Sequence, residues 1–274
     1  MLAAANKDAA ALRERLRGDA AGLSDLPVLS GEAFAEAVAE QPPFGRFGLA
    51  AEDLIRAGLT TAAVPRPTPI AWSRADLDRE AELGARLLRR AGLAARTRTS
   101  DTLDGGLVAP GTLAVTDALD ALDALALPVG PVRDAAALGR VGEVWDVVRP
   151  AALILDPASF RFLYGADGYA RPRAFVVVLT PADGERLAAA PHDDVYRIFS
   201  LPQVNTWIAG ECRAHAGLHL NDDAVIAEVA GGRLVLTARQ RTVVLPRYDS
   251  GIAATIDTAP CACGEASPRL RFGA

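Results

Sequence analysis

The sequence of 274 residues has almost no lysine: Lys7 is the only one among its 29 lysine and arginine residues. Lysine is a common cationic ligand of nucleotide phosphates and the amine that forms Schiff bases with carbonyl substrates. No lysine is therefore available in the interior of the sequence for either role.

Cysteine is also scarce, with three residues in the whole chain. An odd number of cysteines cannot all pair within one chain, and a reducing cytoplasm argues against structural disulfides. A disulfide framework is therefore excluded as the basis of the fold, and metal ligation becomes the more useful question for these thiols.

Excess positive charge and long apolar runs are missing as well. The net charge is −5 and the arginines are scattered, so the basic surface of a nucleic-acid-binding protein is not expected. No stretch approaches the roughly 20 apolar residues of a membrane-spanning helix, and residues 1–8 have no apolar run of the signal-peptide type. We expect a cytoplasmic protein that binds neither nucleic acid nor membrane.

What the chain does have is the composition of a folded globular protein, with 50% hydrophobic and 23% charged residues. Ser30 is placed to cap one helix, and Ser73, with Asp76 three residues on, is placed to cap a longer amphipathic helix that ends at Gly92. Further helices are predicted at 51–57, 117–125 and 183–190, and a proline-rich loop at 58–69.

The fold class predicted from the strands is α/β. Apolar runs at 151–155, 175–179 and 195–198 alternate with helical segments, which is typical of a mostly parallel sheet. Shorter runs at 225–229, 233–237 and 241–245, the first two separated by Gly231-Gly232, predict a small β-rich subdomain. We divide the chain into α/β layers at 1–195 and a β-rich part at 196–274.

One group of residues has the chemistry of a metal site. Cys212 and His219 lie on either side of a Gly217-Leu218 turn, and Cys261 and Cys263 follow about 40 residues later. Three thiolates and one imidazole complete the tetrahedral set of structural zinc, with no position left for a catalytic water. His215 is an alternative fourth ligand. The competing interpretation, three small buried apolar residues, does not explain why every cysteine falls in this group.

Several ordered blocks of sequence resemble a known family. They resemble the G-E-C, G-L-H, G-E-L-V-x-T, P-x-x-R-Y-x-T-G-D and C-x-C-G motifs of the phenylacetate-CoA ligase branch of adenylate-forming enzymes, in the same order and at similar spacing. The matching segments are 209–219, 232–237, 245–251 and 260–264, with weaker matches at 72–78 and 195–201. Within this resemblance the G-L-H block favours His219 over His215 as the fourth ligand.

The resemblance implies a large N-terminal ligase domain, with mixed and parallel sheets, helices and a distorted β-barrel. It also implies acyl and nucleotide pockets in the cleft between these layers, and a homodimer. Yet the residues that handle ATP in the family are altered. The phosphate loop S-S-G-T-T-G-K-P corresponds to Leu59–Pro67, which has no glycine and in which Pro65 and Pro67 remove amide donors.

Two acidic residues of the family are also replaced. Gln203 stands where the family has an acid that helps to hold magnesium, and Ile252 stands where an aspartate binds the ribose. The sequence ends about ten residues after Cys263, where family members continue into a domain with the adenylating lysine. We therefore expect structural zinc as cofactor and no use of ATP or magnesium.

Three functions are compatible with these features. The first is ATP-independent chemistry on a small aromatic or acyl substrate, such as a CoA thioester, in natural-product biosynthesis. Its cleft residues would be Phe199, Ser200, Gln203 and Arg247; Arg247 is placed to pair with a carboxylate, or is a surface or packing arginine. The second is a non-catalytic, zinc-stabilised partner of a pathway protein, and the third is residual ATP-dependent ligation. No catalytic residue is assigned.

Overall fold

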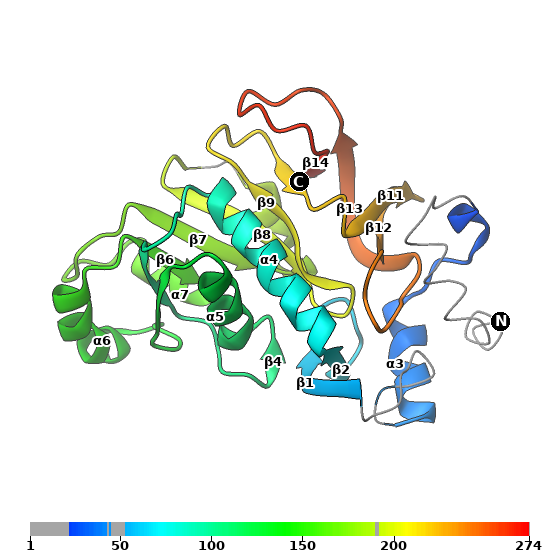
Figure 1. The fold of residues 1–274 in the computed structure, drawn as a ribbon, viewed down its shortest axis with the longest axis horizontal. Coiled ribbons are helices and arrows are strands. Elements are labelled where there is room, and N and C mark those ends of the chain that lie inside the picture. The colour runs from blue at the N-terminus through cyan, green and yellow to red at the C-terminus, as the bar shows by residue number, and fades with distance from the viewer. Residues whose placement is uncertain (1–21, 43, 45–52, 190–191, 274) are drawn as a thin grey trace.

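The computed structural model describes residues 22–42, 44, 53–189 and 192–273. Its centre is an eleven-stranded mixed sheet (Figure 1). The order of the strands in it is β11-β12-β13-β14-β10-β9-β8-β7-β6-β3-β5. The half from β8 to β5 is parallel and the half from β9 to β11 is antiparallel. The predicted α/β fold with a β-rich C-terminal part is confirmed.

The parallel half contains the three apolar runs predicted as strands. Nearly all residues of β6 and β7 are buried, because helices cover both faces of the sheet there. The strands of this half are β3 (Arg98–Asp101), β5 (Leu125–Pro128), β6 (Ala152–Leu155), β7 (Ala174–Leu179) and β8 (Val195–Leu201).

The antiparallel half confirms two of the three short strands predicted for it. The strand predicted at 241–245 is wrong, because this segment bonds to other elements: the Arg241 side chain binds Glu80 and the Thr242 amide donates to Asp76. The strands are β9 (Asn205–Glu211), β10 (Leu218–Leu220), β11 (Val225–Ala230), β12 (Arg233–Ala238), β13 (Tyr248–Asp257) and β14 (Arg269–Phe272).

Two helices, α4 (Arg74–Arg90) and α5 (Thr112–Ala121), lie side by side on one face of the sheet (Figure 1). The predicted capping box is present: the Ser73 hydroxyl accepts from the Asp76 amide, and the Asp76 carboxylate accepts from the Ser73 amide. The helix predicted at 117–125 is wrong in extent. It ends at Ala121 because Asp123 adopts a left-handed conformation and the chain then pairs with β3.

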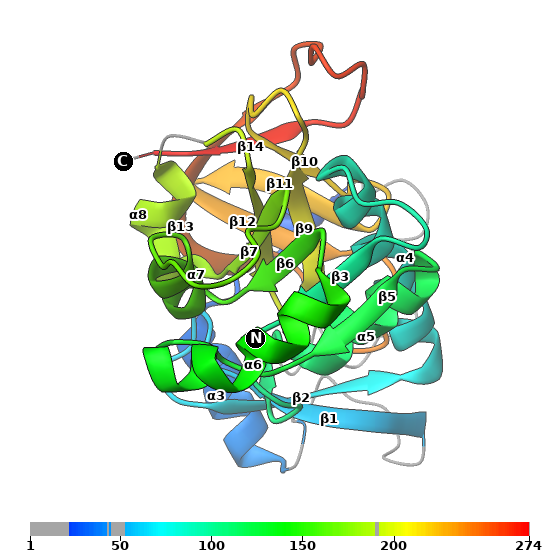
Figure 2. The ribbon, with the colours of Figure 1, turned by 90° about the vertical axis from the view of Figure 1, so that its left-hand side faces the viewer.

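A separate three-stranded sheet, β2-β1-β4, lies at the bottom of Figure 2. Its strands are β1 (Leu54–Thr60), β2 (Thr68–Ser73) and β4 (Val108–Ala109). The helix predicted at 51–57 is therefore wrong from residue 54 on, and residues 51–52 lie outside the described part of the chain. The loop predicted at 58–69 shrinks to a turn between β1 and β2. Pro69 is tolerated in β2 because β2 is an edge strand.

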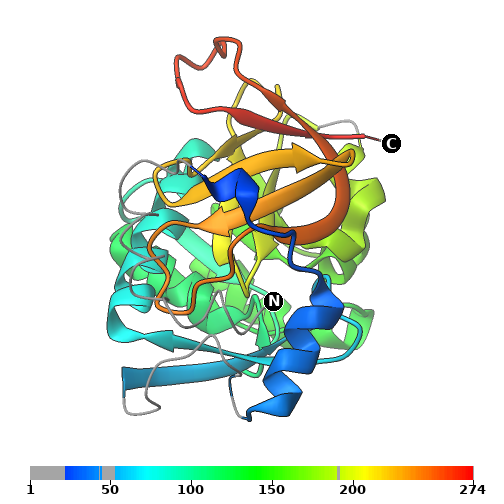
Figure 3. The same ribbon diagram turned by 90° about the vertical axis from the view of Figure 1, so that its right-hand side faces the viewer.

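The N-terminal described segment lies against the antiparallel end of the sheet. Leu29 exchanges backbone hydrogen bonds with Arg247 and Asp249, which places η1 (Leu23–Asp25) and α3 (Gly31–Glu40) beside β13 (Figure 3). The predicted cap of α3 is confirmed, since the Ser30 hydroxyl accepts from the Ala33 amide.

The remaining helices are α6 (Ala135–Val148), α7 (Pro157–Leu163), η4 (Pro181–Asp183) and α8 (Gly184–Ala188). The helix predicted at 183–190 is shorter in the structure, and residue 190 lies outside the described part. The eleven-stranded sheet continues through residue 195, and the division into 1–195 and 196–274 stays a prediction. Among the described residues, no helix has both the length and the apolar character that a membrane crossing requires.

Candidate functional site

The four residues predicted as metal ligands meet at one end of the antiparallel half of the sheet. Cys212 follows β9, His219 is the middle residue of β10, and Cys261 and Cys263 lie in the loop between β13 and β14. Because β10 pairs with both β9 and β14, the sheet itself brings these segments together. The four ligand atoms all lie within 4.8 Å of one another.

Their spacing fits tetrahedral zinc. Bonds of about 2.3 Å to sulfur and about 2.1 Å to nitrogen place two sulfurs about 3.8 Å apart, and a sulfur and a nitrogen about 3.6 Å apart. The sulfurs of Cys212 and Cys261 are 3.8 Å apart, and the sulfur of Cys263 lies 3.4 Å from Nε2 of His219. The donor set therefore matches a closed four-ligand site in kind, and these two separations match it in distance.

Tight turns after the cysteines aim backbone amides at the sulfurs. The His215 amide donates to the Cys212 carbonyl and the Gly264 amide to the Cys261 carbonyl, both at 3.0 Å. The Glu265 amide reaches the sulfur of Cys263 at 3.5 Å. Gly264 has φ of 85°, a value that favours glycine. Amide donors stabilise the thiolate form that a metal ion binds.

His219 is oriented by a hydrogen bond at Nδ1, the ring nitrogen on the side away from the sulfurs. Its side chain is fully buried, and Nδ1 lies 3.2 Å from the carbonyl oxygen of Ser267 and 3.1 Å from its hydroxyl. Donation from Nδ1 to the carbonyl leaves the Nε2 lone pair directed at the sulfurs, the usual arrangement of a metal-bound histidine. His219 of β10 is thus oriented by a residue of the loop that leads into β14.

His215 lies outside this group. Its ring stacks on Tyr196 at 5.0 Å, and Nδ1 lies 3.8 Å from the buried carboxylate of Glu211 without a hydrogen bond. Of the two histidines considered from the sequence, the structure brings only His219 into contact with the cysteines.

The thiols influence one another strongly. Burial raises the pKa of Cys212 to about 12, and the neighbouring sulfurs of Cys263 and Cys261 act in the same direction. Burial also acts to raise the pKa of Cys261, but hydrogen bonds from the Cys263 amide, His219 and the other thiols outweigh it and lower the value to about 6. Cys261 therefore ionises at a lower pH than Cys212. A bound cation is what would ionise Cys212 at neutral pH.

The four predicted cleft residues differ in their surroundings. Phe199 and Ser200 are fully buried in β8, where Phe199 packs on Phe272 with ring centroids 5.0 Å apart. Arg247 donates to Glu228 at 2.6 Å and to the carbonyl oxygens of Ser24 and Leu26. These contacts favour a packing role for Arg247, and the substrate role of all four residues stays a prediction.

Gln203 closes the turn that corresponds to the family's phosphate loop. Its amide nitrogen donates to the Ala62 carbonyl at 2.7 Å, and its oxygen accepts from the Thr60 hydroxyl at 2.9 Å. The Tyr248 hydroxyl donates to the Ala63 carbonyl at 2.9 Å. At Gly31, a Cβ atom would lie 1.9 Å from that same carbonyl oxygen, so only glycine lets α3 approach so closely. The turn is thus packed against its own chain.

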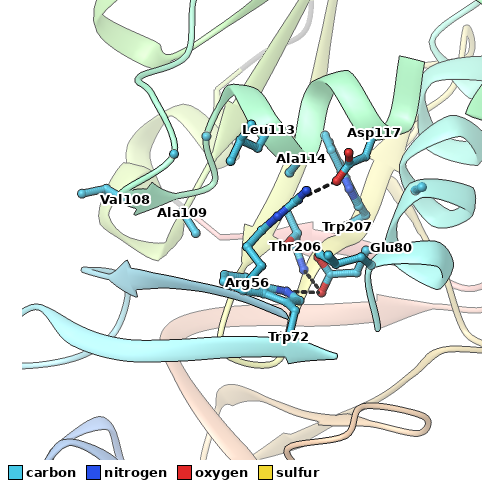
Figure 4. Close-up of a pocket in the computed structure, with 14 residues that line it drawn as sticks. Arg56, Trp72, Glu80, Val108, Ala109, Leu113, Ala114, Asp117, Thr206 and Trp207 are labelled. Atoms are coloured by element: carbon cyan, nitrogen blue, oxygen red, sulfur yellow. Dashed lines mark hydrogen bonds and ion pairs between the residues drawn. The ribbon is translucent and has the colours of Figure 1, made fainter. Parts of the chain in front are cut away.

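A second feature, which the sequence did not point to, is a pocket between α4, α5 and the small sheet (Figure 4). Arg56 of β1 and Asp117 of α5 form an ion pair of 2.5 Å at its opening, and their side chains are 27% and 31% exposed. The remaining lining residues are mostly apolar or small; they include Trp72, Leu77, Ala81, Val108, Leu113 and Ala114. The enclosed space has a volume of about 30 Å³.

Polar groups at the back of this pocket are incompletely paired. Oε1 of Glu80 accepts from the Trp72 indole at 3.2 Å and from the Arg241 guanidinium. The Thr206 hydroxyl and the Trp207 indole nitrogen are buried without a hydrogen-bond partner in the described part of the chain. An unpaired buried donor is costly, which makes these two groups natural partners for a ligand. Of these residues only Trp72 lies in a motif, the weak match at 72–78, and that motif did not point to a pocket.

The fold matches that of the N-terminal domain of adenylate-forming ligases. In solved structures, 90% of the chain matches 57% of 2-hydroxyisobutyryl-CoA ligase in the postadenylation state in complex with R3-HIB-AMP, with a TM-score of 0.76 and 21% identity. Weaker matches are the amide bond synthetase McbA from Marinactinospora thermotolerans (TM-score 0.53, 13% identity, 80% of this chain and 49% of that one) and MenE of E. coli (0.51, 8%, 81% and 48%).

The chain spans less than two thirds of the length of each of these ligases. At such identities the likeness shows the fold alone. No protein-family model and no curated protein sequence matches the chain.

Proposed function

We propose that this chain binds a small aryl or acyl ligand in the pocket between α4 and α5 and acts on it without ATP. The observation that carries the proposal is the contrast between two places on one ligase fold. The turn at the phosphate-loop position is tied to Gln203, Tyr248 and α3, whereas the α4–α5 pocket keeps two unpaired buried donors.

Entry of a ligand requires the Arg56–Asp117 pair to open, because about 30 Å³ holds little more than one water molecule. Both side chains are partly exposed, and ion pairs of that kind typically contribute about 1 kcal/mol or less. A carboxylate or thioester carbonyl that takes the place of Asp117 beside Arg56 would offset this cost. The apolar body of the ligand would then lie against Trp72 and Ala114.

A thermal-shift panel of aryl acids, acyl acids and their CoA thioesters tests ligand binding, since a ligand of the folded state raises the melting temperature by mass action. Ala114→Phe fills the pocket and should abolish the shift, and Ala121→Phe, which adds the same ring to an exposed position of the same helix, should not. A panel in which no compound shifts the wild type contradicts the proposal.

Calorimetry with MgATP at millimolar concentration tests the nucleotide part. We expect no binding heat from the wild type. Gln203→Glu restores the family's acid and loses the bond to the Ala62 carbonyl, but the contacts of the turn with Tyr248 and with α3 at Gly31 remain, so we expect no heat from this variant either. Saturable heat from the wild type would support a residual ATP-dependent ligase instead.

A second candidate function is non-catalytic binding to a pathway protein. Leu107, beside the pocket opening, is 68% exposed and Leu113 is 44% exposed, and paired apolar side chains on a surface favour a protein contact. Under this alternative no compound of the thermal-shift panel raises the melting temperature, and the product of a neighbouring gene co-purifies with this protein. Leu107→Asp then abolishes the complex. Leu125→Asp, on the 46% exposed leucine of β5, is the matched control.

For the cysteine cluster we infer one structural zinc ion, held by Cys212, His219, Cys261 and Cys263. Protein purified without added metal should contain about one zinc per chain. His219→Ala should lose it and His215→Ala should keep it, because only His219 faces the sulfurs. Retention of zinc by both variants, or a folded wild type without metal, would refute the assignment.

A further inference from the structure

A larger cavity lies on the opposite face of the sheet, and the proposed function does not involve it. It has a volume of about 180 Å³ and lies between α7, α8 and the strands β7 and β8. Ile198 faces Leu87 of α4, so its neighbours Val195 and Arg197, which line the cavity, point away from the α4–α5 pocket.

The inner part of the cavity is apolar. Val177 and Leu179 of β7 and Val195 of β8 are at most 6% exposed and form one wall, and Phe160 of α7 adds an aromatic side chain. An engineered cavity of about 150 Å³ with a comparable lining admits benzene. The space therefore suits an apolar group of about the size of one ring.

The opening of the cavity is positively charged. Arg161, Arg186, Arg197 and His192 surround it. Arg197 pairs with Glu211 at 2.5 Å and donates to the Ala189 carbonyl at 2.6 Å, which fixes its guanidinium at the edge of the apolar wall.

The other two guanidinium groups are less committed. Arg186 makes a 3.3 Å contact with Asp183 one helical turn away, and its side chain is 40% exposed. Arg161 has no acidic partner among the residues that the structure describes. Arg161 is thus the guanidinium at the opening that a ligand carboxylate could pair with without displacing an acidic side chain of the described residues.

We propose that this cavity is a binding site for a small apolar carboxylate, with its ring or branched chain against Val177, Leu179 and Val195 and its carboxylate between Arg161 and Arg186. The size of the cavity determines the size of the ligand's apolar group. The arginines at the opening determine that the ligand is an anion. A neutral compound of the same shape lacks the second interaction and binds more weakly.

Titration calorimetry with benzoate is the direct test, and a ligand of nine heavy atoms is expected to bind with a Kd on the order of 1 mM. Benzyl alcohol should bind at least about threefold more weakly, because it offers no charge to exposed guanidinium groups. Cyclohexanecarboxylate, run beside benzoate, shows whether the wall selects an aromatic ring.

Two variants locate the site. Ala189→Phe places a ring at the wall without altering the carbonyl that Arg197 binds, and should weaken benzoate binding at least about tenfold. Arg161→Gln should weaken it about threefold, and Arg140→Gln, which removes an equally exposed charge from α6, should leave it unchanged.

Three outcomes overturn this inference: no benzoate binding, equal binding of benzyl alcohol, or binding that survives Ala189→Phe. If Ala114→Phe abolishes benzoate binding and Ala189→Phe does not, the carboxylate occupies the α4–α5 pocket. That result would support the proposed function and refute this second site, so the two proposals fail separately.

Discussion

Cys261 and Ala262 are neighbours on the same loop, and only the first has a side chain that faces the cluster. Serine at 261 replaces a soft thiolate with a hydroxyl, which is a poor zinc ligand at neutral pH. We expect Cys261→Ser to lose the metal and to lower the free energy of unfolding by on the order of 4 kcal/mol, since loss of a structural metal is among the largest single-residue effects.

Ala262→Ser is the control for this variant. It introduces the same hydroxyl at the next residue, in an exposed position. Chemical denaturation followed by metal analysis of both proteins measures the difference. Equal stability and equal zinc content in the two variants would mean that Cys261 is only a small packing residue.

Asp101, at the end of β3, makes a pH-dependent contribution to the stability of the fold that does not involve the metal. It is 1% exposed, and burial raises its pKa to about 6 although the Leu103 amide and the Thr112 hydroxyl both donate to it. Because the folded state binds this proton more tightly than the unfolded state, the stabilisation is complete below pH 3.8 and is lost as the pH rises through 6.

Asp101→Asn removes this titration and keeps one acceptor and one donor at the site. The stability of the variant relative to wild type should therefore rise by about 1 kcal/mol between pH 5 and pH 7. Asp120→Asn, on an exposed aspartate of α5, should show no such change. Thermal unfolding of the three proteins across this range provides the measurement, and parallel curves for wild type and Asp101→Asn would contradict the prediction.

At the scale of elements, the contact between α4 and α5 depends on Gly84. A Cβ atom there would lie 2.6 Å from Cβ of Ala118 and 2.7 Å from the indole of Trp207. Gly84→Ala should therefore push the two helices and β9 apart, at a cost of about 1–3 kcal/mol.

Gly139→Ala is the matched control, because it adds the same methyl group to the interior of α6 with no atom within 4 Å. This change should stabilise the protein by about 0.5–1 kcal/mol through helix propensity alone. The opposite signs of the two effects, measured by urea denaturation, would separate steric crowding from propensity. If Gly84→Ala leaves the free energy of unfolding unchanged, the two helices can move apart at no cost.

The elements that the sequence predicted correctly are those with a strong local signal. Ser73 and Asp76 form their capping box within four residues, and the run 175–179 is buried on both faces of the sheet. The failures at 51–57 and 241–245 have a non-local cause: β1 is a strand because β2 and β4 lie beside it, and Arg241 bonds to a helix 161 residues earlier.

The candidate sites divide in the same way. The metal cluster was predictable because cysteine and histidine have few other reasons to occur in that order. The α4–α5 pocket was not, because Arg56, Asp117 and Trp207 are ordinary residue types that only the packing of three elements brings together. The cavity beside α7 and α8 is likewise a product of packing.

Across the whole molecule, the metal cluster ties β9 and β10 to the loop between β13 and β14. β10 has only three residues and carries His219, while Cys212 follows β9 and Cys261 and Cys263 precede β14. The buried core is continuous across both halves, but β8 and β9 separate β6 and β7 from β10 and the ligands. Loss of zinc should therefore loosen one end of the sheet and leave the other folded.

Hydrogen exchange with and without a chelator measures this directly. Amides of β10, β14 and the loop 258–268 should lose protection when zinc is removed, and those of β6 and β7 should keep it, because their bonds lie within the parallel core. In Cys261→Ser, which we expect to be metal-free already, the chelator should change nothing further. Equal loss of protection in both halves would instead mean that zinc supports the whole sheet as one cooperative unit.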